Sequence, residues 1–334
     1  MSFMHNSGME RSRIVSVGAW ACLYAAFFAV AVIVRHHVAT TGVAEIWGWD
    51  YRTFFEQIQN WDYISYFGFR HPGLGIILSP LVVLEHIWSG AYLAVMSAVA
   101  LLTAFFIYRL SGLAGLLVWL SFPVTWLMAA IPESFPVAQL ALVGSVLLIN
   151  GNLVSKQECR IHHEWWFLAL SVLNGMITLS NGLKPILAYI VTCHNRRKIF
   201  LFAIYAIVAL SFGIAFFYIR SIVCGRSFLS GIQMTLSWIP EKRDLLHELY
   251  GFFIKPIGFY QSLVVYPLAV YCLVVRRATV SDFKLQILGA FIFIDVLLHI
   301  IVGWGMSEPW VFAPHWVFAL PLVIGTRLEF RGRS

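Results

Sequence analysis

Long apolar runs recur along nearly the whole 334-residue chain, and they constrain its fold more than any other feature. Most of them hold about 17–25 residues, the length that crosses a bilayer core as a helix. Backbone groups in lipid must form hydrogen bonds within their own segment, and the runs lack the short alternation of barrel strands. The pattern predicts an all-α fold, a polytopic transmembrane helical bundle that forms a single transmembrane domain over residues 1–334.

Charge and cysteine content argue against several other classes of protein. The chain is 60% hydrophobic and only 12% charged, and its formal net charge is +7. In a membrane protein, excess Lys and Arg mark cytoplasmic loops, so we expect no nucleic-acid partner. The five cysteines are scattered without a CxxC pair, so they indicate neither a zinc site nor a disulfide framework.

The expected topology has about ten spans and one shorter apolar segment. We expect Leu74–Trp88 to be re-entrant or interfacial, because it is short and interrupted by Glu85 and His86. We expect Trp165–Cys193 to be two helices broken at residues 180–182. These choices place the larger share of the 23 Lys and Arg residues in the cytoplasm with both termini, as the positive-inside rule prefers. The expected spans are Ile14–Val34, Ala91–Tyr108, Leu113–Ala130, Ser134–Asn150, Trp165–Leu179, Leu183–Cys193, Ile199–Ile219, Phe259–Val275, Lys284–Trp304 and Trp310–Thr326.

Most other polar features fall on the external face under this topology. That face receives two long loops. The first, residues 35–90, includes the short apolar segment and is expected to contain amphipathic helices, and the second covers residues 220–258. Three short connections reach the same face, at residues 131–134, 180–185 and 307–309. The sequence therefore predicts a functional site on the external face.

The first external loop holds the acids best suited to catalysis. Asp50 lies in WGWDYRTFF, just beyond the first helix, among aromatic residues. Such surroundings suit a carboxylate that acts as a general base. The alternative is an acid beside an interfacial aromatic belt. Glu56 and Asp62 follow on the same loop, where they either act directly or face water.

Polar residues at other membrane boundaries are further candidates for the site, and the basic ones are suited to contact with phosphate. Arg70 and His71, in FRHPG, are suitable donors, or else they anchor the loop at the interface. Glu133, in PESFP, is costly there unless it has a partner or a wet cavity, although it is equally a plain turn acid. Lys184, beside Asn181 in SNGLKP, either meets a lipid phosphate or snorkels to the interface.

Ionisable residues also occur within and beside the last apolar runs. Asp295 and His299 are four apart in FIFIDVLLHI, on one helical face. They are either metal ligands or a buried hydrogen-bonded pair, and we favour the pair. Glu308 and His315 flank the start of the last helix and are expected to face the same cavity as Asp295 and His299.

The second external loop is rich in basic residues within IPEKRDLLHELYGFFIKP and just before it. These residues either hold an anionic lipid head group or belong to a solvated amphipathic segment, which we favour slightly. They are Arg226, Lys242, Arg243 and Lys255.

Common nucleotide and hydrolase signatures are missing from the sequence. It contains no GxxxxGK[ST], GxGxxG after a strand, GxSxG or HExxH motif. An enzyme of this kind would need a substrate that is already activated and is delivered in the membrane.

The stretch from Trp47 to Pro80 resembles the GT-C glycosyltransferases. The shared order is a first membrane helix, an external loop with an early acid at Asp50, an aromatic series that ends in His71-Pro72-Gly73, and a short apolar helix. Tyr51 follows Asp50 where members of the family often have a second acid. The aromatic series is Tyr51, Phe54, Phe55, Tyr63, Tyr66, Phe67 and Phe69.

The resemblance implies a membrane transferase that uses a polyprenyl-phosphate-linked sugar. Asp50 would be the general base, and Glu133 and Asp62 are the candidates for a second catalytic acid. No residue is assigned to a metal, although a divalent cation could replace one of the phosphate-binding donors. The candidates for binding the substrate or its lipid phosphate are Arg70, His71, Lys184, Asn181, Glu308 and His315.

The same resemblance implies the partners and the location of the protein. The partners would be the polyprenyl-phosphate sugar donor, an acceptor glycan, lipid or protein, and membrane lipid. The location is either a bacterial inner membrane or the endoplasmic reticulum, and the compact chain favours the bacterial inner membrane, with the active site facing the periplasm.

A transporter or flippase of a lipid-linked saccharide is the main alternative. It predicts inverted repeats, paired broken helices at mid-membrane and charges along a path. The sequence shows no repeat, and its polar features gather on one face. A non-catalytic membrane subunit is a third interpretation, which leaves the acids on that face unexplained.

Overall fold

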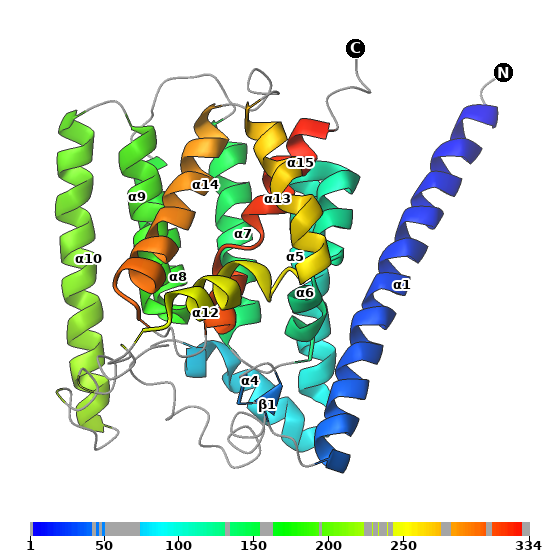
Figure 1. Ribbon diagram of the computed structural model, residues 1–334, viewed down its shortest axis with the longest axis horizontal. Coiled ribbons are helices and arrows are strands. Elements are labelled where there is room, and N and C mark those ends of the chain that lie inside the picture. Colours follow the sequence, from blue (N-terminus) through cyan, green and yellow to red (C-terminus); the bar gives the residue numbers. More distant parts are fainter. Residues whose placement is uncertain are drawn as a thin grey trace.

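The computed structural model describes the protein as a bundle of helices (Figure 1). It covers residues 3–41, 45–46, 49–50, 74–130, 134–153, 163–193, 196–223, 243–274, 282–304 and 309–328, with three isolated positions between 224 and 242. The described part has the predicted all-α fold, and its one β element is a short antiparallel hairpin, β1 (Glu45–Ile46) and β2 (Trp49–Asp50). The amphipathic helices expected after Asp50 lie outside the described residues.

Three described helices are long and apolar enough to cross a membrane. They are Val17–Thr41 within α1 (Phe3–Thr41), α5 (Ala91–Leu120), and Lys284–Ile301, which joins α14 (Asp282–Asp295) to the π-helix η3 (Val296–Ile301). A bent pair provides a fourth candidate: α12 (Leu245–Leu249) continues as π-helix η2 (Tyr250–Ile254) and meets α13 (Phe259–Val274) at 77°. These helices fit an integral membrane protein.

The long helix α5 reverses direction near Gly112. This residue has φ 68° and ψ −164°, which are not helical and which favour glycine. Trp20 of α1 contacts Tyr108, whereas Phe27, further along α1, contacts Trp119. A straight α5 antiparallel to α1 would carry Trp119 away from Phe27, so the second leg must run back. The reversal agrees with the predicted separation of the runs that end at Tyr108 and begin at Leu113.

The predicted break at residues 180–182 is confirmed. α8 (His163–Ile177) is followed by the 3-10 helix η1 (Leu179–Gly182) and then by α9 (Leu183–Thr192). α9 packs back along α8, and the Ser171 hydroxyl donates a hydrogen bond to the Gly182 carbonyl at 2.6 Å. α10 (Arg196–Val223) then descends at the edge of the bundle (Figure 1).

The short apolar segment before α5 forms α4 (Leu74–Ile87), which has 14 residues and rises roughly 21 Å, less than a bilayer core. Glu85 is 6% exposed and accepts hydrogen bonds from the backbone N–H groups of Gly90 at 2.8 Å and Tyr92 at 3.0 Å. Glu85 therefore caps the start of α5, which explains an acid in this apolar segment. After α5, the chain continues through α6 (Pro123–Met128) and α7 (Ser134–Leu153).

The prediction of one continuous helix over Trp310–Thr326 is wrong. The chain forms a 3-10 helix, η4 (Pro309–His315), and α15 (Ala319–Leu328) begins only after a turn. Pro314 lies inside η4 and lacks the N–H that a continuous α-helix would need. α15 ends on the side of the bundle where α1 begins (Figure 1).

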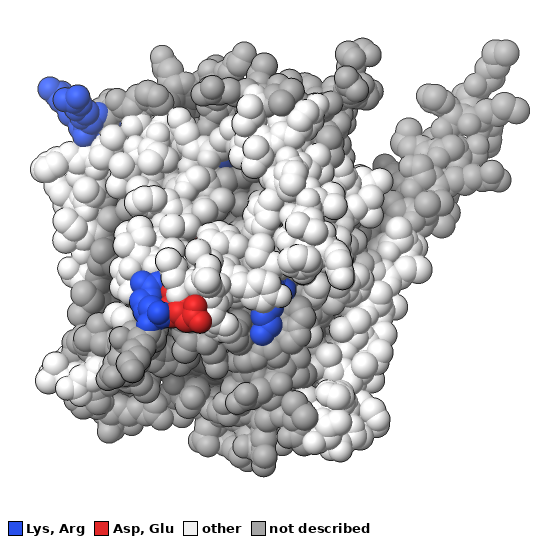
Figure 2. Space-filling model, in the orientation of Figure 1, with Lys and Arg blue, Asp and Glu red and all other residues white. Residues whose placement is uncertain are grey.

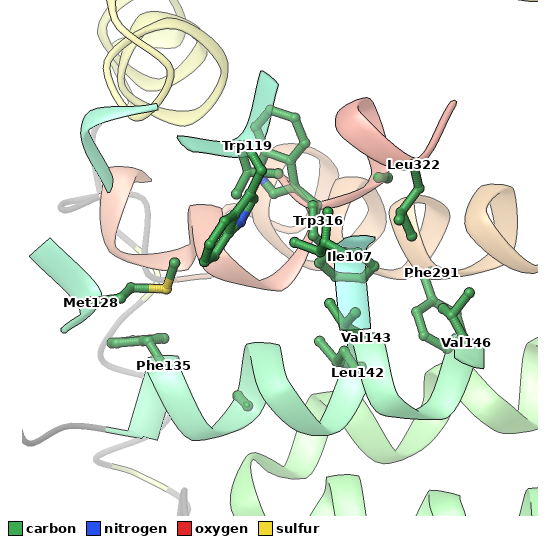
Figure 3. Packing of buried hydrophobic residues seen from close by; sticks show 14 of the residues in the cluster. Ile107, Trp119, Met128, Phe135, Leu142, Val143, Val146, Phe291, Trp316 and Leu322 are labelled. Carbon is green, nitrogen blue, oxygen red and sulfur yellow. The ribbon is translucent and has the colours of Figure 1, made fainter. Parts of the chain in front are cut away.

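The core lies where α5, α7, α14 and α15 meet. Figure 3 shows Trp119, Val143, Phe291 and Leu322 packed in one cluster with neighbouring apolar side chains, and all four are almost fully buried. α5 and α15 come especially close: a Cβ on Gly325 would lie 2.3 Å from the backbone oxygen of Ser111. Small residues at helix contacts permit this approach in membranes.

The flanks of the bundle are apolar. Figure 2 shows charged side chains as isolated groups on the described part of one face, including the region where α10 begins. Large side chains point outward on α10 and α13, including Phe200 at 67%, Val264 at 65% and Tyr260 at 80% exposure. Such a surface is suited to lipid rather than water.

Candidate functional site

A buried ion pair joins α9 to α14. The Lys184 ammonium donates to Asp295 Oδ2 at 2.8 Å, and the side chains are 0% and 1% exposed. The same ammonium donates to the backbone carbonyl of His315 at 3.0 Å, which connects η4 to the pair. Ionisable groups inside a membrane protein are costly, so such groups pair and often mark a functional site.

The break between α8 and α9 positions Lys184. It lies in the first turn of α9, one turn after Asn181, and Asn181 is also fully buried. Neither amide atom of Asn181 has a hydrogen-bond partner among the described residues. Lysine has three N–H donors, and two of those of Lys184 are used by Asp295 and His315. Asn181 and Lys184 therefore retain the capacity to bind a polar ligand.

His299 does not form the hydrogen-bonded pair with Asp295 that we favoured. Its Nδ1 lies 2.8 Å from the backbone carbonyl of Trp304, and Asp295 bonds Lys184 instead. A carbonyl only accepts, so Nδ1 carries the proton and Nε2 carries a lone pair. Opposite charge explains the change of partner: the ammonium neutralises the buried carboxylate, which a neutral imidazole does not.

His315 lies at the end of η4, against the start of α7. The ring centroids of His315 and Phe135 lie 5.3 Å apart. Phe312 in the same η4 stacks on His299, with ring centroids 4.2 Å apart. Gln139 on α7 donates to the carbonyl of Pro314 at 3.0 Å, which ties down the residue before His315. Asp295, His299 and His315 each offer a ligand atom, and these atoms lie within 4.8 Å of one another.

A second ion pair, between Arg243 and Glu248, contacts the end of η3. Arg243 donates to Glu248 Oε2 at 2.5 Å and to the backbone carbonyl of Ile300 at 2.7 Å. The hydrogen bonds with Glu248 raise the pKa of Arg243. A Cβ on Gly303 would lie 2.9 Å from the guanidinium carbon, so glycine makes room for it. Arg243, which we assigned to a solvated amphipathic segment, therefore holds α12 against η3.

The predicted site residues divide into three groups. The structure brings Lys184 and the backbone of His315 together, and it places Asn181 one turn before Lys184. It describes Asp50 only as backbone in β2. Outside the described residues lie Asp62, Arg70, His71, Glu133 and Glu308, together with Glu56, Arg226 and Lys242.

Sequence reasoning missed the partnership of Lys184 with Asp295. The two residues are 111 positions apart, so no local pattern links them. Their opposite charges within two apolar segments were the available signal, because each charge needs a partner in lipid.

Comparisons with family models, with curated proteins and with solved structures found no match to this chain.

Proposed function

We propose that this protein is a membrane glycosyltransferase of the GT-C type, which transfers a sugar from a polyprenyl-phosphate-linked donor to an acceptor. The buried Lys184, held at a helix break by Asp295 and His315, is the observation that carries the proposal. The two bonds to Asp295 and His315 use two of the three N–H donors of Lys184, and the third donor is suited to an oxygen of a lipid phosphate. The resemblance over Trp47–Pro80 supplies the reaction class.

The proposed reaction is a single displacement at the sugar. The Asp50 carboxylate takes the proton of an acceptor hydroxyl, and the acceptor oxygen forms a bond to C1 of the sugar. The bond from C1 to the phosphate oxygen breaks, and its electron pair leaves with the lipid phosphate. Lys184 and Asn181 would stabilise this developing charge, an effect worth a few kcal/mol per donor in comparable sites.

The wider arrangement gives further support. In Figure 1, the β1 and β2 hairpin, α4 and the end of α10 lie at the same edge of the bundle. α14 descends toward that half of the molecule and carries Asp295 at its end. We propose that this edge is the external face of a bundle of about ten spans, with α4 re-entrant or interfacial. We place the protein in a bacterial inner membrane, with the site facing the periplasm.

A transporter or flippase of a lipid-linked saccharide is the second candidate. The break at η1 and the 77° bend between η2 and α13 favour it, because discontinuous helices form the substrate sites of many transporters. The two candidates differ in one outcome: a transporter moves the lipid-linked sugar across the bilayer without releasing the lipid phosphate.

The deciding experiment is a transfer assay with purified full-length protein. A panel of radiolabelled polyprenyl-phosphate sugars is supplied with a membrane extract as acceptor source, and free polyprenyl phosphate is measured. We expect release by the wild type and a loss of at least about 100-fold in Asp50→Asn, which lacks the general base.

Asp244→Asn is the matched control, because Asp244 caps α12 from an exposed position and asparagine caps a helix equally well. It should release lipid phosphate at the wild-type rate. Equal release by Asp50→Asn would remove Asp50 from the chemistry and direct attention to Glu133 and Asp62. If no donor is turned over while reconstituted vesicles move lipid-linked sugar across the bilayer, the chain is a transporter.

A further inference from the structure

We propose that Asp295, His299 and His315 bind one divalent transition-metal ion of the zinc class. The three side chains come from the end of α14, from η3 and from η4, and all are buried. Their ligand atoms lie within 4.8 Å of one another. The inference goes beyond the proposed function and stands whether or not the chain transfers sugars.

Two of the three residues each hold a buried acceptor atom that remains available for a ligand bond. Asp295 Oδ1 and His299 Nε2 are fully buried and have no hydrogen-bond partner among the described residues. Both are acceptors, because the carboxylate oxygen carries no proton beside Lys184 and the His299 proton is on Nδ1. Two acceptors do not satisfy each other, whereas a cation bound by both residues satisfies both.

The outer contacts of these ligands are those of a metal site. Lys184 holds Asp295 through Oδ2 and leaves Oδ1 available, while the carbonyl of Trp304 fixes the ring of His299 through Nδ1. Such partners orient metal ligands and set the histidine tautomer. Gln139 steadies the backbone just before His315. A hydrogen bond to a neighbouring residue therefore fixes the side chain of Asp295, the ring of His299 and the backbone before His315.

The chemistry of the three ligands selects the class of metal. Two imidazoles and one carboxylate suit zinc and related transition ions, whereas magnesium and calcium prefer oxygen ligands. Zinc bonds of roughly 2.0–2.2 Å place neighbouring ligand atoms about 3.4 Å apart. The side chains therefore need rotations that move their ligand atoms by on the order of 1 Å to close on one ion.

Charge balance explains what such an ion adds. Lys184 and Asp295 neutralise each other, and the neutral imidazoles contribute no charge. A divalent ion makes the cluster doubly positive, which a phosphate dianion in the fourth ligand position would balance. With the ion bound, the cluster would carry a net positive charge and could bind an anion. Without it, the side chains of the cluster have no net charge.

Metal retention by the purified full-length chain tests the proposal. The protein carries an affinity tag without histidine, is stripped with EDTA, reloaded with Zn²⁺ and desalted, and its metal content is measured by mass spectrometry. We expect about one zinc per wild-type chain and at least a tenfold lower content in His299→Gln and in His315→Gln. Magnesium at the same concentration should not be retained.

His36→Gln is the matched control, since His36 is an exposed histidine near the end of α1. It should retain zinc as the wild type does. Retention of zinc by His299→Gln and His315→Gln at the wild-type level would overturn the proposal.

A measurement on the wild type alone guards against variants that fail to fold. Zn²⁺ should raise the midpoint of thermal unfolding of stripped protein by several degrees, and excess EDTA should reverse the rise, because a ligand that binds only the folded state stabilises it. No zinc-dependent shift and no retained zinc would overturn the proposal without reference to any variant.

Discussion

Lys184 and Asp295 form the ion pair on which the buried polar cluster depends. At 0% and 1% exposure neither charge reaches solvent, so each is compensated by the other. Removing one member of such a pair leaves an uncompensated charge and typically costs about 3–5 kcal/mol, whereas apolar replacement of both is often neutral. The pair thus makes the stability of the bundle sensitive to a single substitution.

Lys184→Met should lower the stability of the metal-free protein by about 3–5 kcal/mol, because Asp295 loses its counter-ion. The double variant Lys184→Met/Asp295→Leu should recover most of that loss. In thermal unfolding in detergent with EDTA present, we expect the highest midpoint for the wild type, a lower one for the double variant, and the lowest for Lys184→Met.

Arg196→Met controls for the loss of a positive charge, because Arg196 lies exposed at the start of α10. It should change stability by less than about 0.5 kcal/mol. If Lys184→Met were as stable as this control, the ion pair would not contribute to the fold.

The contact between α5 and α15 depends on glycine at the scale of whole helices. A Cβ on Gly325 would lie 2.3 Å from the Ser111 oxygen and 2.6 Å from the Gly115 nitrogen, both backbone atoms. Gly325→Ala should therefore destabilise the protein by about 1–3 kcal/mol through forced separation of the helices. Gly289→Ala is the matched control on α14, where nothing lies within 4 Å of a Cβ. Equal unfolding midpoints for the two variants would contradict the close packing.

The cap from α4 onto α5 predicts a second effect at this scale. Glu85→Ala leaves the N–H groups of Gly90 and Tyr92 without their acceptor, and each such loss costs about 1–3 kcal/mol when the group is buried. Glu85→Gln keeps one acceptor oxygen and should lie between wild type and Glu85→Ala in thermal unfolding. An unchanged midpoint for Glu85→Ala would show that water replaces the cap.

The cap also predicts a pH dependence. Burial raises the pKa of Glu85 above its ordinary 4.5, against the opposing effects of the Gly90 N–H and Arg35. The folded chain therefore holds a proton at Glu85 more readily than the unfolded chain does. Its stability should fall as the pH rises from 4.5 through the raised pKa, and unfolding of Glu85→Gln should show a flatter profile.

For the whole molecule, the two ends of the described chain lie on one side of the bundle. α1 begins and α15 ends at the same edge, while α12 lies toward the opposite half (Figure 1). In a chain freed of its own cysteines, Leu246→Cys on α12, a position 81% exposed, should react with a membrane-impermeant maleimide added to intact cells. Arg196→Cys should react only after permeabilisation. The reverse pattern would invert the proposed orientation.

The apolar runs by themselves determined that this is a helical membrane protein, because the hydrophobic effect and backbone hydrogen bonding in lipid act on local composition. The break at residues 180–182 was predicted from the distribution of Lys and Arg along the chain, and the turn between Tyr108 and Leu113 from the interrupted run. The continuous helix predicted over Trp310–Thr326 was wrong, because Pro314 and its neighbours form η4 instead. Local patterns were reliable where local energetics decide.

Tertiary structure decided which polar residues meet. Asp295 was expected beside His299, its neighbour on one helix face, but it bonds Lys184 across 111 positions. The sequence shows that a buried charge needs a partner, and only the packing of α9 against α14 shows which one it receives. Electrostatic energy depends on the distance between charges in space rather than along the chain. The sequence therefore identified the buried ionisable residues of the site, but it did not show which of them form an ion pair.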